Sequence, residues 1–495
     1  HLFPFAHALG PYLLAVHAMA AAGAYLWLRS LRLGRWPALG GAALFAAGGL
    51  MVGHMQYPNL TSTVAMTPWM FLLADRPLLQ GLASAAALAA GYPPVWAGMT
   101  AAHFALRWLW AAEPTPAGLA GAYLRLAAGT ALGCALGAVV LAPGLELAAN
   151  SQRARGVDLQ ERTNYSMTPL ELLSLIHPGV ARRAVLARQE AKPGKEEVVW
   201  TYEGVASTFT FYSSYQDPLE DPGGAKAIPW KSAYAGLGGA TAALGGLAWL
   251  IAAQPARGAW AGAFMGACVL LLLGNHHPAS RWLWENVPGL SFLRGPARLG
   301  FLVYAATAPL AAIGLAALGR LRASKTMKRA AMAAGAIAIL GELAWLGAGF
   351  YPTIDKAYYA QRGELVEFLT ERLGTHRYWQ FTLLEVWAYV NKRSDHPRYE
   401  EFKQAVYRTY KQKLFGLSNG PYHLAAASGS YEPLVPAGTE RLDRDVLEKG
   451  IFEAGPRLRW AGVRYMTNRR FSPELEKTMG IRRRPAKDPG TGGKW

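Results

Sequence analysis

Two arginines lie four residues apart at the edge of an apolar stretch: Arg294 and Arg298, on either side of Pro296. The stretch that begins near Leu299 is long and apolar enough to be a membrane span. Pro296 suits the first turn of a helix, so we expect both guanidinium groups to project from a helix N-terminus, where backbone N–H groups already favour an anion. The alternative is that both arginines snorkel at the membrane edge. The spacing therefore predicts an anion-binding site.

A second charged group follows directly on an apolar stretch: Glu146, Arg153 and Arg155, with Asn150 and Ser151 between them. A carboxylate with arginines one or two turns away could position an acceptor molecule or hold a phosphate. The alternative is a local ion pair that shapes the loop, worth ~0 to 1 kcal/mol when exposed. Both interpretations remain open at the level of the sequence.

A third group is polar without being charged: His54, Gln56, Tyr57 and Asn59, in a short connection between two apolar stretches. Such side chains suit the hydroxyl groups of a sugar. They suit helix capping equally well, since Asn59 or Thr61 could be an N-cap.

Other titratable residues favour structural roles. The adjacent His276 and His277 would point apart on a helix or strand, and no third residue stands at a zinc-like spacing from them. His17 is alone in an apolar stretch and is interpreted as a hydrogen-bonded packing residue. Glu342 is expected to have a structural partner, although ionisable groups inside a membrane are functional candidates by default.

The elements that must position these side chains are membrane helices. Of the 495 residues, 52% are hydrophobic and 17% are charged, and the apolar residues gather in stretches close to the ~20 that cross a bilayer. We predict a mainly α, polytopic transmembrane bundle over residues 1–350, and a separate domain over 351–495. The expected spans are 8–28, 37–53, 61–74, 77–91, 94–111, 118–143, 233–253, 258–274, 299–318 and 330–350.

The basic residues predict the orientation of this bundle. Alternate connections between the spans hold twelve of them: Arg29, Arg32, Arg35, Arg76, Arg107, Arg125, Arg257, Arg320, Arg322, Lys325, Lys328 and Arg329. The short connections on the other side hold only Arg281, Arg294 and Arg298. By the positive-inside rule the first set is cytoplasmic. The long loop 145–232 and the tail 351–495 are then extracytoplasmic, together with all three candidate groups.

Several patterns argue against other classes of protein. The formal charge of +18 is dispersed over many loops without a nucleic-acid-binding motif, so anionic lipid headgroups are the expected partner and nucleic acid is not. Cys134 and Cys268 both fall in apolar stretches, where a disulfide framework is not expected. The run Gly236 to Gly239 lacks the residues of a phosphate loop and predicts close helix packing.

The tail predicts an α+β domain. Helical periodicity covers Glu364–Leu373 and Tyr399–Phe415. Short strands are predicted over Tyr378–Leu384, Tyr422–Ala427 and Leu458–Met466.

Five motifs occur in an order that resembles the YfhO-type bacterial membrane proteins, and the resemblance extends over nearly the whole chain. They are Pro143–Glu146, Ser151–Arg153, Met167–Gly179, Leu270–Asn275 and Pro288–Arg298, with Gly429–Leu434 and Ala461–Tyr465 similar to the family's outer domain. The resemblance implies a glycosyltransferase of the GT-C type. Such an enzyme takes a sugar from a polyprenyl-phosphate carrier and adds it to an acceptor, here an envelope glycopolymer or lipid, on the outer face of the bacterial cytoplasmic membrane.

The chain departs from that family at one point. GT-C enzymes carry a catalytic acidic residue, usually Asp, in the first outer loop, whereas the first acidic residue here is Asp75, which the charge pattern places near the cytoplasm. We therefore expect the catalytic residue to lie upstream of His1. The sequence identifies no cofactor with certainty, and a divalent cation stays an open alternative. A non-catalytic envelope scaffold and a lipid or glycan transporter are the competing functions.

Overall fold

The computed structural model describes residues 5–55, 57–110, 115–151, 158–163, 166–169, 171–176, 234–287, 289–290, 293, 295–348, 362, 364–380 and 456–467. The chain forms two compact units. The larger contains residues 9–145 and 157–353, and the smaller contains 1–8, 146–156 and 354–495.

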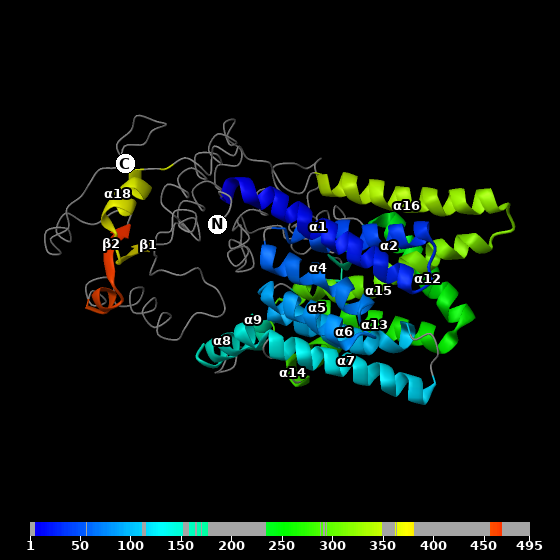
Figure 1. The fold of residues 1–495 in the computed structure, drawn as a ribbon, viewed down its shortest axis with the longest axis horizontal. Coiled ribbons are helices and arrows are strands. Elements are labelled where there is room, and N and C mark those ends of the chain that lie inside the picture. The colour runs from blue at the N-terminus through cyan, green and yellow to red at the C-terminus, as the bar shows by residue number, and fades with distance from the viewer. Residues whose placement is uncertain are drawn as a thin grey trace, which may run out of the picture. The chain divides into compact units, whose positions relative to one another are not determined.

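The larger unit is a bundle of helices, which confirms a mainly helical, multi-pass architecture (Figure 1). Its long helices are α1 (Phe5–Ser30), α2 (Arg35–Ala47), α4 (Pro58–Leu72), α5 (Pro77–Ala89), α6 (Pro93–Trp110), α7 (Pro116–Leu136), α8 (Ala138–Ala149), α12 (Gly236–Ala253), α13 (Pro255–Leu273), α15 (Gly300–Ala317) and α16 (Lys325–Ala348). Shorter helices and 3-10 turns connect them: α3 (Gly49–Gly53), α9 (Leu159–Arg162), η2 (Glu171–Leu175), η5 (Gly274–His276), α14 (Pro278–Asn286), η7 (Pro296–Leu299) and η8 (Leu318–Arg320).

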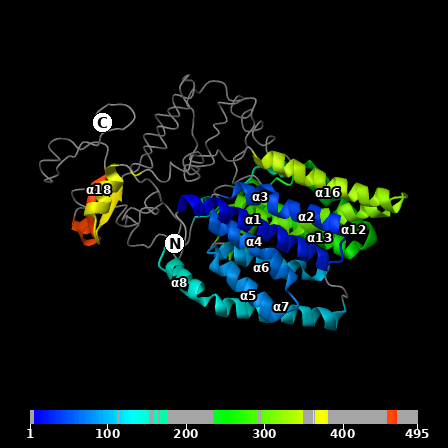
Figure 2. The ribbon, with the colours of Figure 1, turned by 45° about the horizontal axis from the view of Figure 1, so that its top comes forward.

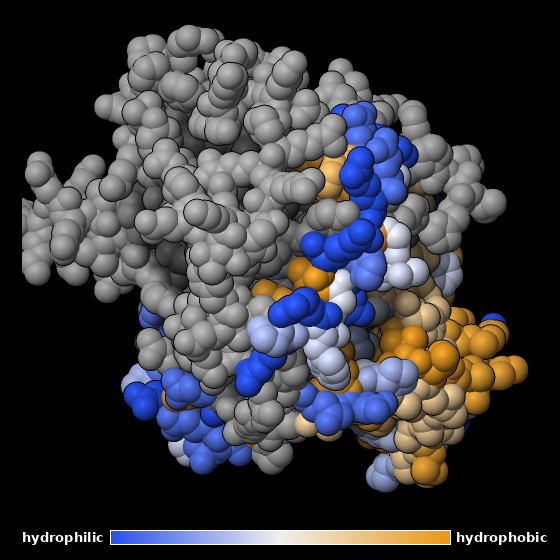
Figure 3. All heavy atoms as spheres, turned by 90° about the vertical axis from the view of Figure 1, so that its left-hand side faces the viewer, coloured by the Kyte–Doolittle hydropathy of each residue, from blue (hydrophilic) through white to orange (hydrophobic). Residues whose placement is uncertain are grey.

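The centre of the bundle is formed by α2 and α15. Neighbouring helices bury 78% of the apolar stretch of α2 and α3, and 72% of the stretch that includes α15. The other five helices of spanning length are only 17–28% buried. Figure 3 shows hydrophobic residues (orange) exposed on one flank beside hydrophilic ones (blue). Exposed apolar helix faces of this kind need an apolar solvent, which a bilayer supplies.

Glycines allow α7 to lie directly against α5 (Figure 1 and Figure 2). Gly129 and Gly133, one turn apart on α7, face Gln80 and Ser84, one turn apart on α5. Gly129 lies opposite Gln80, and Gly133, one turn later, lies opposite Ser84, one turn later. The two helices therefore run parallel. A Cβ atom at Gly133 would lie 2.5 Å from the Cβ of Ser84, so this separation requires glycine.

The run Gly236 to Gly239 is confirmed as a region of close packing. A Cβ at Gly239 would lie 3.1 Å from Cδ1 of Leu44, and one at Gly238 would lie 3.0 Å from a carboxylate oxygen of Glu342.

Glu342 has the structural partner that the sequence favoured. From α16 its carboxylate accepts hydrogen bonds from the backbone N–H groups of Leu237 (2.6 Å) and Gly238 (2.8 Å). These two groups belong to the first turn of α12, whose N–H groups have no acceptor within the helix. Glu342 therefore caps α12 and ties it to α16.

Among the described residues, seven helical segments are long and apolar enough to cross a membrane, against the ten spans predicted. The other three predicted spans correspond to α4, α5 and α6 within the same bundle, and α4 and α5 have only 15 and 13 residues. The continuous span predicted over 118–143 is wrong. The helix breaks at Gly137, where a Cβ would lie 2.6 Å from Cδ1 of Leu88, and α8 begins at Ala138.

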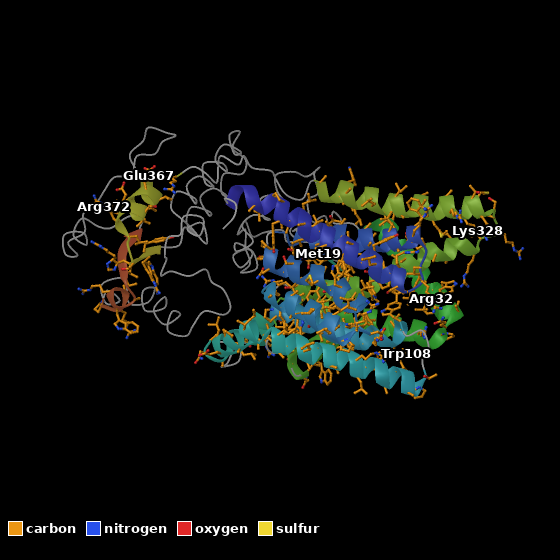
Figure 4. The ribbon with its side chains drawn as sticks, in the orientation of Figure 1. Met19, Arg32, Trp108, Lys328, Glu367 and Arg372 are labelled. Atoms are coloured by element: carbon orange, nitrogen blue, oxygen red, sulfur yellow. The ribbon has the colours of Figure 1, made fainter. Side chains whose placement is uncertain are left out.

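The basic connections gather at one end of the bundle. There Asp75 pairs with Arg107 and with Arg125 (3.3 Å), joining the α4–α5 turn to α6 and α7. Figure 4 shows Arg32 and Lys328 at this same end. The sequence predicted that the basic connections lie on one side of the bundle, and in the structure those of Arg32, Asp75 and Lys328 share one end.

At the opposite end, residues 166–169 and 171–176 are attached to the bundle. The backbone nitrogen of Met167 donates to the carbonyl of Leu272 at the end of α13 (2.8 Å). Thr168 and Glu171 form a reciprocal capping box at the start of η2, with the Thr168 nitrogen 2.7 Å from the Glu171 carboxylate and the Glu171 nitrogen 3.1 Å from the Thr168 hydroxyl. The capping of η2 therefore explains why Thr168 and Glu171 occur in the motif Met167–Gly179.

The smaller unit contains α18 (Glu364–Arg372) and two parallel strands, β1 (Arg377–Gln380) and β2 (Val463–Thr467). This confirms the helix predicted over Glu364–Leu373 and the start of the strand predicted over Tyr378–Leu384, of which residues 381–384 lie outside the described residues. The strand predicted over Leu458–Met466 starts too early: residues 456–460 are helical, and the chain turns at Gly462 (φ +78°) before β2. Tyr399–Phe415 and Tyr422–Ala427 lie outside the described residues.

Candidate anion-binding site

Arg298 lies in η7, at the start of the buried helix α15. The preceding Gly295 adopts a left-handed conformation (φ +75°), and a Cβ there would lie 3.5 Å from Cδ of Arg298. Because other L residues rarely adopt this conformation, glycine allows the tight turn over which the Arg298 side chain folds. Pro296 follows at the first position of η7, as predicted.

The guanidinium group of Arg298 contacts two tyrosines from distant parts of the chain. Its NH1 group donates to the hydroxyl of Tyr92 (3.2 Å), and its Cζ lies 5.5 Å from the centroid of the Tyr57 ring. The second distance is within the range of a cation–π contact. These contacts hold the cation at the end of the bundle that lies opposite the basic connections.

Three helix N-termini converge on this cation. Tyr57 is the N-cap of α4, Tyr92 directly precedes α6, and Arg298 itself leads into α15. The partial positive charge at each N-terminus adds to the charge of Arg298, which favours an anion at this point.

His54 lies beside this group, in the turn that follows α3. It is only 1% exposed, and its Nδ1 atom lies 2.9 Å from the carbonyl oxygen of Leu50. A carbonyl can only accept, so Nδ1 carries the proton and Nε2 keeps a lone pair. Nε2 has no hydrogen-bond partner in the part of the chain that the structure describes.

Burial and the nearby positive charge keep His54 neutral. Burial is the larger cause and the charge of Arg298 the smaller, and together they lower the pKa of His54 from 6.5 to about 4, against the opposing effect of the bond to Leu50. At neutral pH this end of the bundle therefore presents one permanent cation and one neutral acceptor nitrogen.

Asn59 lies at the same end but has a different environment. The Asn59 side chain is exposed, and its Oδ1 atom accepts a hydrogen bond from the backbone nitrogen of Leu60 (2.9 Å). A Cβ atom added at Gly91 would lie 3.8 Å from the Cβ of Asn59. The alternative prediction of an N-cap is wrong for both Asn59 and Thr61, because α4 begins at Pro58 and Tyr57 is its N-cap.

The structure places none of the remaining candidates relative to Arg298. Glu146 is exposed on α8, in the part of that helix that belongs to the smaller unit. Gln56, Arg294, Arg153 and Arg155 lie outside the described residues.

Three residues of the site were not among the sequence candidates: Tyr92, Gly295 and Arg162. The carbonyl of Arg162, the last residue of α9, accepts from the nitrogen of Gly295 (3.1 Å), and its side chain donates to the carbonyl of Trp284 (3.1 Å). Nothing local in the sequence distinguishes Arg162.

No group of three or more His, Cys, Asp or Glu side chains suited to a metal occurs among the described residues. His276 ends η5, while His277 is the N-cap of α14 and accepts from the nitrogen of Ala279 (3.2 Å). Comparison of the chain with protein-family models, with curated proteins and with solved structures gave no match.

Proposed function

We propose that this chain is a membrane glycosyltransferase of the GT-C type, similar to the YfhO-type proteins. It would take a sugar from a polyprenyl-phosphate carrier and transfer it to a glycopolymer or lipid acceptor on the extracytoplasmic face of the bacterial cytoplasmic membrane. The order of motifs in the sequence motivates this function.

One structural observation supports it above the others: Arg298 stands where three helix N-termini meet, at the end of the bundle that lacks the basic connections. Most arginines at a membrane edge can be explained by snorkelling into headgroups. Arg298 instead is half-buried and held by Tyr57 and Tyr92, which suits recognition of a specific anion.

In this proposal Arg298 binds a phosphate oxygen of the carrier and stabilises the charge that stays on the lipid phosphate as the sugar leaves. Arg294 is proposed to contribute further positive charge, and Asn59 to contact the sugar or the acceptor. Asp75 is not proposed as the catalytic acid, because it pairs with Arg107 and Arg125 at the opposite end.

The test is the binding of a polyprenyl phosphate to the full chain in nanodiscs. Loss of one charge-assisted contact corresponds to about 1.5–3 kcal/mol, so Arg298→Ala should weaken binding by roughly 10- to 100-fold. Arg298→Lys should give an intermediate affinity, because Lys keeps the charge but not the planar donor group.

Arg281→Ala is the matched control. Arg281 is an exposed arginine of α14 that pairs with Glu285 (2.9 Å), and its loss should leave phosphate affinity unchanged within about twofold. Equal affinities for wild type and Arg298→Ala would contradict the proposal. So would wild-type rates of sugar transfer in the full-length Arg298→Ala protein. Phosphate binding without any transfer by the wild type would favour the scaffold or transporter.

A further inference from the structure

We infer that His54 is a specificity-determining residue of this site: its Nε2 atom accepts a hydrogen bond from a hydroxyl group of the ligand whose phosphate Arg298 binds. The inference rests on the proposed function and narrows the ligand to a phosphate ester that carries a hydroxylated group. The bare lipid phosphate would be bound less tightly.

The first argument is the fixed tautomer. The bond from Nδ1 to the carbonyl of Leu50 holds the ring in place and leaves Nε2 as an acceptor. The same carbonyl of Leu50 also accepts from the backbone nitrogen of His54 (3.2 Å), so the backbone and the ring of His54 are both tied to α3. The acceptor is therefore set in place before any ligand arrives.

The second argument is that this acceptor is buried without a partner. Buried polar atoms are almost always hydrogen-bonded, because leaving one unpaired costs its full desolvation energy. His54 is 1% exposed and its Nε2 lacks a partner among the described residues. An unpaired buried acceptor beside a cationic site is the arrangement expected where a ligand supplies the missing donor.

The third argument concerns which donor fits. A phosphate oxygen and the lone pair of Nε2 would repel each other, since neither has a proton to donate. The phosphate is therefore placed at Arg298. An ammonium group would be repelled by Arg298, whose charge reaches His54. A neutral hydroxyl close to the phosphate satisfies both groups at once. The half-buried ring of Tyr57 lies next to His54, with the two ring centroids 6.2 Å apart.

The experiment compares two probes of equal chain length, a polyprenyl phosphate and a polyprenyl-phosphate hexose, on the full chain in nanodiscs. We expect the wild type to bind the hexose ester about three- to tenfold more tightly, the size of one neutral hydrogen bond. His54→Asn keeps a donor at the Nδ1 position but has no acceptor at the Nε2 position. It should lose this preference while binding the plain phosphate as the wild type does.

Two further variants complete the design. His54→Gln can place an amide oxygen near the position of Nε2 and should keep most of the preference. His17→Asn is the matched control, because the Nδ1 atom of His17 also bonds a carbonyl, that of Ala46 (2.7 Å), and its Nε2 is likewise unpaired among the described residues. His17 lies on α1, and no contact links it to Arg298 or His54 among the described residues, so this variant should change neither affinity.

The outcomes separate the inference from the proposed function. If Arg298→Ala weakens both probes but His54→Asn affects both equally or neither, the role of His54 is refuted and the phosphate site stands. If Arg298→Ala affects neither probe, the proposed function fails as well. Should His54→Asn not fold, a series of monodeoxy-hexose esters on the wild type decides: one deoxy position that abolishes the preference supports the inference, and a flat series overturns it.

Discussion

At the scale of single residues, the site depends on side chains whose protonation is set by their surroundings. His54 stays neutral because burial disfavours its charged form, and Arg298 adds to that effect. The same property that makes Nε2 an acceptor therefore makes the folded chain sensitive to acid.

This gives a prediction for stability against pH. Above pH 6.5 His54 is neutral in both the folded and the unfolded chain. Below 6.5 the unfolded chain binds a proton, whereas the folded chain does so only near pH 4. The contribution of neutral His54 to folding is therefore lost as the pH falls from about 6.5 to 4, by an amount on the order of 3 kcal/mol.

The measurement is the free energy of unfolding in detergent at pH 7 and at pH 4.5, for wild type and His54→Asn. The variant should lose less stability than the wild type, because Asn does not titrate in this range. Identical losses in the two proteins would show that His54 is not held neutral.

At the scale of helices, contacts between small residues decide which helices become neighbours. Apolar side chains gain little by leaving lipid for one another, so close backbone approach supplies much of the association energy in a membrane. Helices α5 and α7 approach at Gly129 and Gly133, and α12 and α15 approach where a Cβ at Gly314 would lie 3.0 Å from the nitrogen of Gly246.

Gly133→Ala should destabilise the bundle by about 1–3 kcal/mol, because the added methyl group meets Ser84. Gly121→Ala is the control on the same helix. The nearest atom to a Cβ at Gly121 is the flexible end of Arg125, at 3.5 Å, so this variant should be neutral or slightly more stable. Thermal unfolding in detergent measures both. A destabilised Gly121→Ala with an unaffected Gly133→Ala would contradict the packing seen between α5 and α7.

Glu342 gives a second prediction at this scale. Glu342→Ala removes the cap from α12 and should cost about 1–2 kcal/mol, whereas Glu342→Gln keeps one acceptor and should cost less. Amide hydrogen exchange should rise at Leu237 and Gly238 in the Ala variant, because these two groups lose their acceptor. Glu285→Ala, which breaks only an exposed pair with Arg281, should leave the exchange of both amides unchanged.

At the scale of the whole molecule, the bundle separates two chemically different ends. One end carries the basic connections and the salt bridges of Asp75 with Arg107 and Arg125. The other end carries His54, Tyr57, Tyr92 and Arg298. The positive-inside rule predicts that the first end faces the cytoplasm.

This orientation is tested by labelling single cysteines in intact cells, after Cys134 and Cys268 have been replaced by Ala. A cysteine at Asn286, on the exposed α14, should react with a membrane-impermeant maleimide. A cysteine at Arg322, in the exposed turn after η8, should react only after lysis. The reverse pattern would place the Arg298 site in the cytoplasm and remove the basis for an extracytoplasmic transferase.

Properties that depend on neighbouring residues were predictable from the sequence. The length of apolar stretches predicted the helices, Pro296 predicted that Arg298 stands at a helix N-terminus, and the distribution of Lys and Arg predicted which connections share an end. Helix breaks inside apolar stretches were missed at Gly137 and, between α2 and α3, at Gly48, because each break accommodates a side chain from another helix.

The sequence by itself therefore determined a multi-pass helical protein with an arginine at the start of a buried helix, because hydrophobicity, charge and proline act over a few residues. Only the tertiary structure decided what surrounds that arginine. Tyr92 is 206 residues from Arg298 along the chain, and Arg162 meets the Gly295 turn through its backbone. Such contacts depend on which helices pack together, and that is decided by shape complementarity among small residues far apart in the sequence.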